Sequence, residues 1–332
     1  MIDRRLPLID LHRHLDGSVR LETILALADE HGIELPARDF ESLRRHVQIS
    51  GREPSVMAFI ERFRWLREVM ASTEACRRIA YESVEDAKLE GIDYIELRFS
   101  PWFMAERHRL DPAAVVDAVL DGINAGRRDF GVGVGVIGIL SRTYGPAIAR
   151  EELQALLRGR DRIVALDLAG DEARMPAGLF AEHFARARDA GWRVTVHAGE
   201  AAGAQSVWDA IRELGATRIG HAVRAGEDPR LLDHMLEHGV SIEANLTSNV
   251  QTSAVANYGV HPLKRWLNLG LVANLNTDDP AISGIDLAHE YRVATPAAGL
   301  TADHIRQAQW NALEMAFLTP DARAELERRK RA

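Results

Sequence analysis

Residues 10–17 read DLHRHLDG, and this stretch has the form of a buried strand that ends in polar side chains. Because side chains alternate between the two faces of a strand, His12 and His14 are expected on the same face. Two imidazoles that converge on one point can bind a metal ion, although a hydrogen-bonded pair of structural histidines would show the same spacing. A metal site therefore needs further ligands from elsewhere in the chain.

The rest of the chain alternates short β-branched runs with amphipathic helical stretches. Glycine stands repeatedly where a helix would stop, and Asp-Pro pairs at 111–112 and 228–229 are typical of helix starts. This pattern predicts an α/β fold, a (β/α)₈ TIM barrel, in which chemistry sits at the carboxyl ends of the strands. The predicted strands are 8–14, 92–100, 132–141, 163–170, 193–197, 218–223, 241–249 and 271–278.

No internal repeat and no linker rich in Pro, Gly or Ser divides the chain, so one barrel domain over residues 1–332 is expected. The longest insertion, about residues 33–90, lies between the first two predicted strands. Four of its apolar residues share a helical face, which by periodicity alone favours a stripe packed on the outside of the barrel. The alternative is a hydrophobic lid over a ligand. These residues are Val56, Phe59, Ile60 and Phe63.

The composition favours a small-molecule ligand. The 332 residues include 49 acidic and 41 basic side chains, a formal net charge of −8, which argues against nucleic-acid or anionic-membrane partners. The single cysteine excludes an intrachain disulfide and indicates a reducing compartment. No signal-peptide run or membrane-spanning apolar stretch is present, so we expect a cytoplasmic protein.

Histidines and carboxylates gather at the ends of four predicted strands, in HRHLDG, VTVHAGE, RIGHAV and NLNTDDP, and the seventh predicted strand ends in the polar ANLTSN. A lone histidine in a core is most often a hydrogen-bonded structural residue, but so many at one end of a barrel favour a functional site. Three histidines and one carboxylate suit zinc, leave a position open for water and lower the pKa of that water towards ~7. The candidate ligands are His12, His14, His197 and Asp278.

A hydrolytic site also needs a proton carrier. Glu200 lies three residues after His197, with Gly199 allowing the turn, and can deliver a proton to a substrate. His221 can hydrogen-bond the attacking hydroxide. The residues that other catalytic sites need are missing from the sequence. None of the three lysines lies at a strand end, where it could bridge two metal ions, and a single cysteine cannot form the zinc site of a cytidine deaminase. Neither the GxSxG motif of serine hydrolases nor a P-loop occurs.

The chain resembles the bacterial type of the adenosine deaminase family, within the amidohydrolase superfamily, over nearly its whole length. The motifs that carry the resemblance are LIDLHRHLDGSVR (8–20), YIELRFSP (94–101), ALDLAGDE (165–172), VTVHAGEAAG (194–203), RIGHAV (218–223), LTSNVQTS (246–253) and NTDDP (276–280). Two features depart from the family pattern: Ala222 stands where glycine is usual, and EANLTSN differs from more familiar versions of the seventh strand.

The resemblance implies one zinc ion per chain and a role for each catalytic residue. Glu200 would protonate purine N1 while hydroxide attacks C6, and His221 would orient that hydroxide. Asp278 would assist proton transfer as well as bind the metal. The implied zinc ligands are His12, His14, His197 and Asp278.

The resemblance also implies how a purine nucleoside is bound. Asp16 would contact the ribose 5′-hydroxyl, the backbone N–H of Gly170 would meet N3, and Asp279 would hydrogen-bond N7, with His14 also at the substrate. Because N7 is an acceptor, Asp279 is predicted to be protonated in the complex. The resemblance further favours the lid over the outer stripe for the apolar side chains of the insertion.

The activity implied is hydrolytic deamination of adenosine and 2′-deoxyadenosine to inosine and 2′-deoxyinosine, with release of ammonia, in purine salvage. This is the reaction of a hydrolase acting on the C–N bond of a cyclic amidine. Alternatives on the same machinery are another 6-aminopurine nucleoside, such as aminofutalosine, or adenine. A third hypothesis is a nucleoside-binding protein without catalytic activity. The presence of Glu200 and His221 beside a complete set of metal ligands argues against it. No protein partner is predicted.

Overall fold

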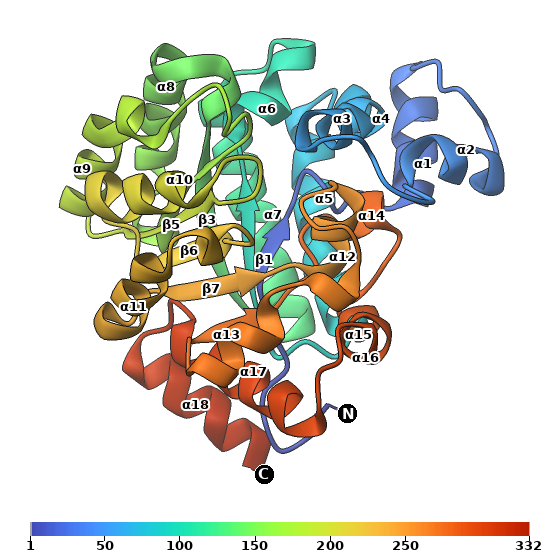
Figure 1. Cartoon of the computed structure of the whole chain (residues 1–332). Coiled ribbons are helices and arrows are strands. Elements are labelled where there is room, and N and C mark those ends of the chain that lie inside the picture. Colours follow the sequence, from blue (N-terminus) through green and yellow to red (C-terminus); the bar gives the residue numbers. More distant parts are fainter. Residues whose placement is uncertain (1, 332) are drawn as a thin grey trace.

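The computed structural model describes residues 2–331, in which eight parallel strands form one sheet in the order β1 to β8 (Figure 1). Each strand pairs with the next one along the chain, and helices run between them. The strands are β1 (Ile9–His14), β2 (Tyr94–Phe99), β3 (Gly133–Ser141), β4 (Ala165–Ala169), β5 (Arg193–Ala198), β6 (Arg218–His221), β7 (Ser241–Ala244) and β8 (Ala273–Leu275).

The sheet closes on itself between its first and last strands. The N–H of Asp278 donates to the carbonyl of His12, and the N–H of His14 donates to the carbonyl of Asp278, both at 2.8 Å. The side-chain Oδ1 of Asn276 accepts the N–H of Leu11 at 2.8 Å. These contacts complete the barrel and confirm the predicted (β/α)₈ TIM fold.

Two predicted strands extend too far: the strand predicted over 271–278 ends at Leu275, and the strand predicted over 241–249 is wrong over its second half. The prediction ran over 241–249, but β7 ends at Ala244, and the chain then turns into helix α12 (Leu246–Gln251). Strand β7 has no paired residue beyond Ala244. The backbone bonds become local there, with the N–H of Asn249 donated to the carbonyl of Asn245 at 2.9 Å. The polar LTSN segment is therefore helical.

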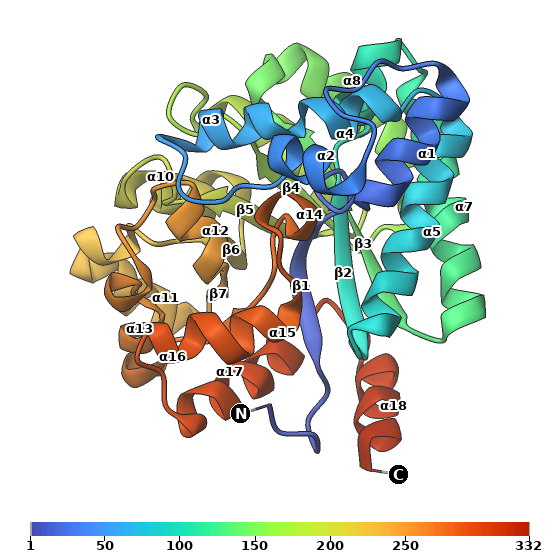
Figure 2. The same cartoon turned by 90° about the vertical axis from the view of Figure 1, so that its right-hand side faces the viewer.

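The longest connection, between β1 and β2, folds as five helices. Figure 2 shows α2, α3 and α4 at the carboxyl ends of the strands, while α17 and α18 lie at the opposite end of the barrel. Within residues 2–331 no helix has both the length and the apolar character needed to cross a bilayer. The helices of this insertion are α1 (Leu21–His31), α2 (Phe40–Val47), α3 (Val56–Ile60), α4 (Arg64–Val69) and α5 (Thr73–Leu89).

The remaining helices surround the barrel and cover its lower end (Figures 1 and 2). Besides α12 they are α6 (Pro101–Ala105), α7 (Pro112–Phe130), α8 (Gly145–Arg158), α9 (Ala181–Asp189), α10 (Ala204–Asp209), α11 (Pro229–His238), α13 (Leu263–Leu269), α14 (Pro280–Ser283), α15 (Leu287–His289), α16 (Thr295–Ala297), α17 (Ala302–Met315) and α18 (Pro320–Arg331).

Helix α7 shows how local sequence sets these elements. The carboxylate of Asp111 caps its first turn by accepting the N–H of Ala113 at 3.0 Å, and Gly131 ends it in the left-handed conformation, with φ of 69°. A Cβ on Gly122 would lie 2.2 Å from the carbonyl oxygen of Arg77 in α5, so only glycine permits this approach. Helix α5, the last of the insertion, is thereby held against the barrel.

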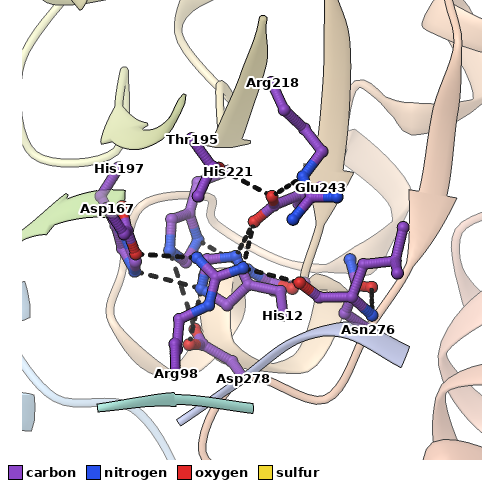
Figure 3. Close-up of polar contacts among 12 residues, drawn as sticks. His12, Arg98, Asp167, Thr195, His197, Arg218, His221, Glu243, Asn276 and Asp278 are labelled. Atoms are coloured by element: carbon purple, nitrogen blue, oxygen red, sulfur yellow. Dashed lines mark hydrogen bonds and ion pairs between the residues drawn. The ribbon is translucent and has the colours of Figure 1, made fainter. Parts of the chain in front are cut away.

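Charged side chains fill the inside of the barrel (Figure 3). Arg98 donates from Nη1 to Asp167 at 2.8 Å and from Nη2 to Glu243 at 2.7 Å, and Arg218 contacts both Glu243 and Glu96. All five side chains are buried. Burial alone would raise the pKa of Glu243, but Arg98 and Arg218 hold it well below its usual value. Each charge in this network therefore depends on its partners.

The substitution Arg98→Met tests that dependence. It leaves two buried carboxylates without their common cation, so the free energy of unfolding should fall by about 3–5 kcal/mol, measured by urea denaturation. As a control, Arg77→Met removes the exposed ion pair with Asp121 and should leave the unfolding midpoint unchanged. Equal midpoints for Arg98→Met and the parent protein would contradict the dependence.

Candidate active site

A cavity of about 300 Å³ opens at the carboxyl ends of the strands, beneath the insertion helices. Residues singled out in the sequence line the cavity from the barrel side, and five apolar residues of the insertion line it from the other side. His12 lies below this lining and is fully buried. The barrel-side residues are His14, Asp16, Gly170, His197, Glu200, His221, Asp278 and Asp279. The apolar insertion residues are the four predicted ones, Val56, Phe59, Ile60 and Phe63, together with Met57, which was not predicted.

Three ring nitrogens and one carboxylate oxygen converge at the floor of the cavity. His197 Nε2 lies 3.1 Å from both His12 Nε2 and His14 Nε2. Asp278 Oδ1 lies 3.1 Å from His12 Nε2 and 3.4 Å from His14 Nε2. A tetrahedral ion with bonds of about 2.0–2.1 Å has ligand atoms about 3.3–3.4 Å apart. The spacing fits a small divalent metal ion.

In two of these rings, the contacts of Nδ1 show whether the converging Nε2 atom has a hydrogen or a lone pair (Figure 3). His12 Nδ1 lies 2.5 Å from Glu243 Oε2, and His197 Nδ1 lies 3.0 Å from Asp167 Oδ2. Because an ionised carboxylate only accepts, both Nδ1 atoms must carry hydrogen. Burial lowers the pKa of His197 to about 4, so this ring is neutral and its Nε2 has a lone pair. Opposed lone pairs repel, and a cation between them removes the conflict.

His221 also approaches this cluster. Its Nε2 lies 3.8 Å from Asp278 Oδ2, and one nitrogen of His221 falls within 4.8 Å of ligand atoms on His12, His197 and Asp278. Proximity alone therefore offers two candidates for the fourth ligand. His14 Nε2 is the closer of the two to Asp278, at 3.4 Å.

The backbone around these side chains is strained. His221, Ala222 and Asp278 adopt the left-handed conformation, with φ of 66°, 53° and 65°. Ala222 is buried and does not line the cavity. A Cβ on Gly220 would lie 2.9 Å from His12 Cε1, so the glycine before His221 makes room for this imidazole. The RIGHAV turn therefore places both histidines.

Glu200 lies in the cavity wall on a tightly held loop. The carboxylate of Glu172 accepts four consecutive backbone N–H groups, those of residues 199–202, at 2.6–3.2 Å. Glu200 Oε1 accepts the hydroxyl of Thr252 at 3.1 Å. Burial, together with the negative charge of Asp278, raises the pKa of Glu200 well above its usual value. The surroundings of Glu200 therefore favour its neutral acid form.

Two further carboxyl groups face the cavity with hydrogen-bonding capacity to spare. Among residues 2–331, Asp16 Oδ1 and Asp279 Oδ1 have no hydrogen-bond partner. Burial and the adjacent charge of Asp278 raise the pKa of Asp279 well above its usual value. A Cβ on Gly17 would lie 1.9 Å from Asp279 Oδ1, which explains the glycine that ends DLHRHLDG. A protonated Asp279 can donate a hydrogen bond to a ligand.

The insertion is attached to the wall of the cavity near Glu200. Phe63 stacks edge-to-face on Phe59 and on Phe103 of α6, with ring centroids 6.1 and 5.7 Å apart. The N–H of Glu53 donates to the carbonyl of Gln251 at 2.7 Å, at the end of helix α12. The apolar face of the insertion thus points into the cavity, and its action as a lid stays a prediction.

Sequence reasoning missed the carboxylates behind the histidines. Asp167 and Glu172 both lie in the quoted ALDLAGDE motif, from which only a glycine was assigned a role. A signal for such groups was present in YIELRF, where Glu96 and Arg98 are charged residues two apart in an otherwise apolar strand. Charges in a buried strand require partners, and here Glu243 supplies one for Arg98.

The contact between Asp167 and His197 can be tested through metal binding. Asp167→Asn keeps the shape of the side chain but makes it a weaker acceptor for His197 Nδ1. The affinity for a divalent ion should fall by about 10–100-fold, measured by competition with a chelator. Asp121→Asn, the same change on an exposed side chain of α7, should leave this affinity unchanged. Equal affinities of the two variants would contradict an orienting role for Asp167.

Comparisons with known proteins agree with the fold and the motifs. The sequence model of the adenosine deaminase family matches residues 7–330. Adenosine deaminase of Edwardsiella ictaluri is 60% identical over 320 residues, covering 96% of each chain. Adenine deaminase of Arthrobacter aurescens is 26% identical with a TM-score of 0.90, covering 98% of each chain. A Burkholderia ambifaria amidohydrolase, solved with bound zinc, is 25% identical with a TM-score of 0.87, covering 98% of this chain and 90% of its own.

These matches extend over the strand ends that form the cavity. The family match spans all eight strands, from β1 at Ile9 to β8 at Leu275. The high identity of the Edwardsiella ictaluri relative is not confined to one motif, since its alignment covers nearly the whole chain. The chain belongs to the adenosine deaminase family.

Proposed function

We propose that the protein deaminates adenosine and 2′-deoxyadenosine hydrolytically, giving inosine and 2′-deoxyinosine plus ammonia, with one zinc ion per chain. The observation that carries this proposal is a buried carboxyl group, Glu200, in the wall of the cavity at whose floor three histidines and an aspartate converge. The name of the relative at 60% identity, adenosine deaminase, supports the choice of substrate.

The donor atoms favour zinc. Three imidazole nitrogens and one carboxylate oxygen are borderline-soft and hard ligands of the kind found in catalytic zinc sites with an open position. A bound zinc ion would lower the pKa of a water molecule towards ~7 and so supply the nucleophile. The residues that would hold it are His12, His14, His197 and Asp278.

In the proposed reaction the oxygen of water adds to C6, and the C6–N bond then breaks to release ammonia. Glu200 donates its proton to N1, which makes C6 more electrophilic. His221 orients the attacking oxygen by a hydrogen bond. Asp278 accepts a proton from that oxygen and passes it to the departing nitrogen, which leaves as ammonia. The other proton of the water replaces the one that Glu200 gave to N1.

Recognition of the purine nucleoside is assigned to groups around the cavity. Asp16 binds the ribose 5′-hydroxyl, the N–H of Gly170 faces N3, and a protonated Asp279 donates to N7, with His14 at the substrate edge. The raised pKa of Asp279 supports the direction of that hydrogen bond. Four apolar side chains would close over the substrate and exclude water. These are Val56, Phe59, Ile60 and Phe63.

The same proposal treats residues 1–332 as one barrel domain with the insertion of about residues 33–90 as its lid. It places the protein in the cytoplasm. The chain has a single cysteine, Cys76, and therefore no intrachain disulfide, which supports a reducing compartment.

The first test is turnover by zinc-quantified protein. Adenosine and 2′-deoxyadenosine should be converted to their inosines with about one zinc per chain, followed by the change in ultraviolet absorbance. Adenine and other 6-aminopurine nucleosides, such as aminofutalosine, are assayed in parallel. If kcat/KM for one of these compounds exceeds that for adenosine by orders of magnitude, that compound is the substrate instead of adenosine. Full zinc content without turnover of any of them would contradict the proposed reaction.

Glu200→Gln tests the acid. The amide keeps the size of the side chain but has no acidic proton, so kcat should fall by about 10²–10⁴-fold while the zinc content is retained. Glu182→Gln, on the exposed side of α9, is the matched control and should keep full activity. Wild-type kcat in Glu200→Gln would remove Glu200 from the catalytic residues.

A further inference from the structure

The LTSN segment (246–249) lies directly behind His221. Because the chain turns into α12 after β7, the side chain of Asn249 points back at this imidazole. Asn249 Nδ2 lies 2.8 Å from His221 Nδ1, and Asn245 Nδ2 lies 3.3 Å from the same atom. Asn249 is completely buried. Two amide groups therefore converge on one ring nitrogen.

The orientation of the Asn249 amide is set by His261. The backbone N–H of Leu263 donates to His261 Nδ1 at 3.1 Å, so this nitrogen must offer a lone pair. Burial lowers the pKa of His261 to about 3, which keeps the ring neutral. Its hydrogen is then on Nε2, which lies 3.1 Å from Asn249 Oδ1 and can only donate to it.

A backbone N–H thus determines the proton positions along a chain of three side chains. With its oxygen occupied by His261, Asn249 must present its NH₂ group to His221, and His221 Nδ1 must accept. Glu200 Oε1 also approaches this nitrogen, at 3.7 Å, but lies outside hydrogen-bonding distance. The hydrogen of a neutral His221 is therefore on Nε2, the atom that faces the metal ligands.

We propose that Asn249 and His261 are positioning residues that hold His221 as its Nε2–H tautomer, so that His221 donates a hydrogen bond to the attacking oxygen. A nitrogen that carries hydrogen has no lone pair, so His221 is neither the fourth metal ligand nor the acceptor of a proton from water. This leaves His14 as the ligand. The identity of the attacking oxygen in this inference rests on the proposed function. The tautomer of His221 does not rest on it, because it follows from the hydrogen bonds alone.

Nitrogen NMR of the zinc-loaded protein reads the tautomer directly. The protein contains 13 histidines, so the signals of His221 are assigned as those lost in His221→Gln. The proposal requires a pyridine-type Nδ1 and a pyrrole-type Nε2. A protonated Nδ1 would overturn it. This spectrum needs no turnover, so a protein that fails to deaminate adenosine can still pass or fail the test.

A pair of variants at His261 tests what the tautomer does. His261→Gln keeps a donor for Asn249 Oδ1, whereas His261→Leu removes it. In His261→Leu, kcat should fall at least about tenfold at unchanged zinc content, with KM within about threefold of the wild-type value. In serine proteases a wrongly set histidine tautomer costs about 10⁴-fold in kcat, which gives the upper scale. His261→Gln should restore kcat to within about threefold.

Equal kcat values in the two His261 variants, whether both high or both low, would contradict a role for the hydrogen-bond donor that residue 261 offers to Asn249 Oδ1. Circular dichroism and zinc content establish that each variant is folded and loaded. If His261→Leu does not fold, the wild-type NMR spectrum and the kcat of His261→Gln still test the proposal. A tenfold loss of kcat in His261→Gln would contradict it.

Discussion

The guanidinium of Arg98 joins two carboxylates inside the barrel, and much of the site depends on this bridge. One carboxylate, Asp167, holds the imidazole of His197, and the other, Glu243, holds that of His12. Both anions are fully buried, so they are stable only while a cation lies between them. The orientation of the two imidazoles thus depends on an ion pair that also holds three strands together.

The same network links the cavity to the other end of the barrel. Glu243 accepts from Arg218, which in turn donates to the carbonyl of Met315 at the end of α17 at 3.0 Å. Hydrogen bonds in a water-free interior are strong, and an unpaired member is costly. The stability of the fold and the geometry of the site therefore depend on the same buried side chains.

Neighbouring carboxyl groups in the cavity have opposite tendencies to ionise. Burial alone would raise the pKa of Asp278, but the neighbouring imidazole of His12 holds it well below its usual value. The negative charge of Asp278 then adds to burial in raising the pKa of Asp279 and of Glu200. One ionised group thus helps to keep two others protonated, which separates an anionic ligand from two proton donors.

The sequence by itself determined the barrel, the order of its strands and the residue types that meet in the cavity, because alternation and strand spacing are local properties of the chain. It did not determine the end of β7, where pairing with β8 ran out, nor the partners of the histidines. Those partners are remote: His12 and Glu243 are 231 residues apart. Which nitrogen carries a hydrogen, and which carboxyl stays neutral, was decided only by the tertiary structure, because both depend on burial and on charges brought together from different strands.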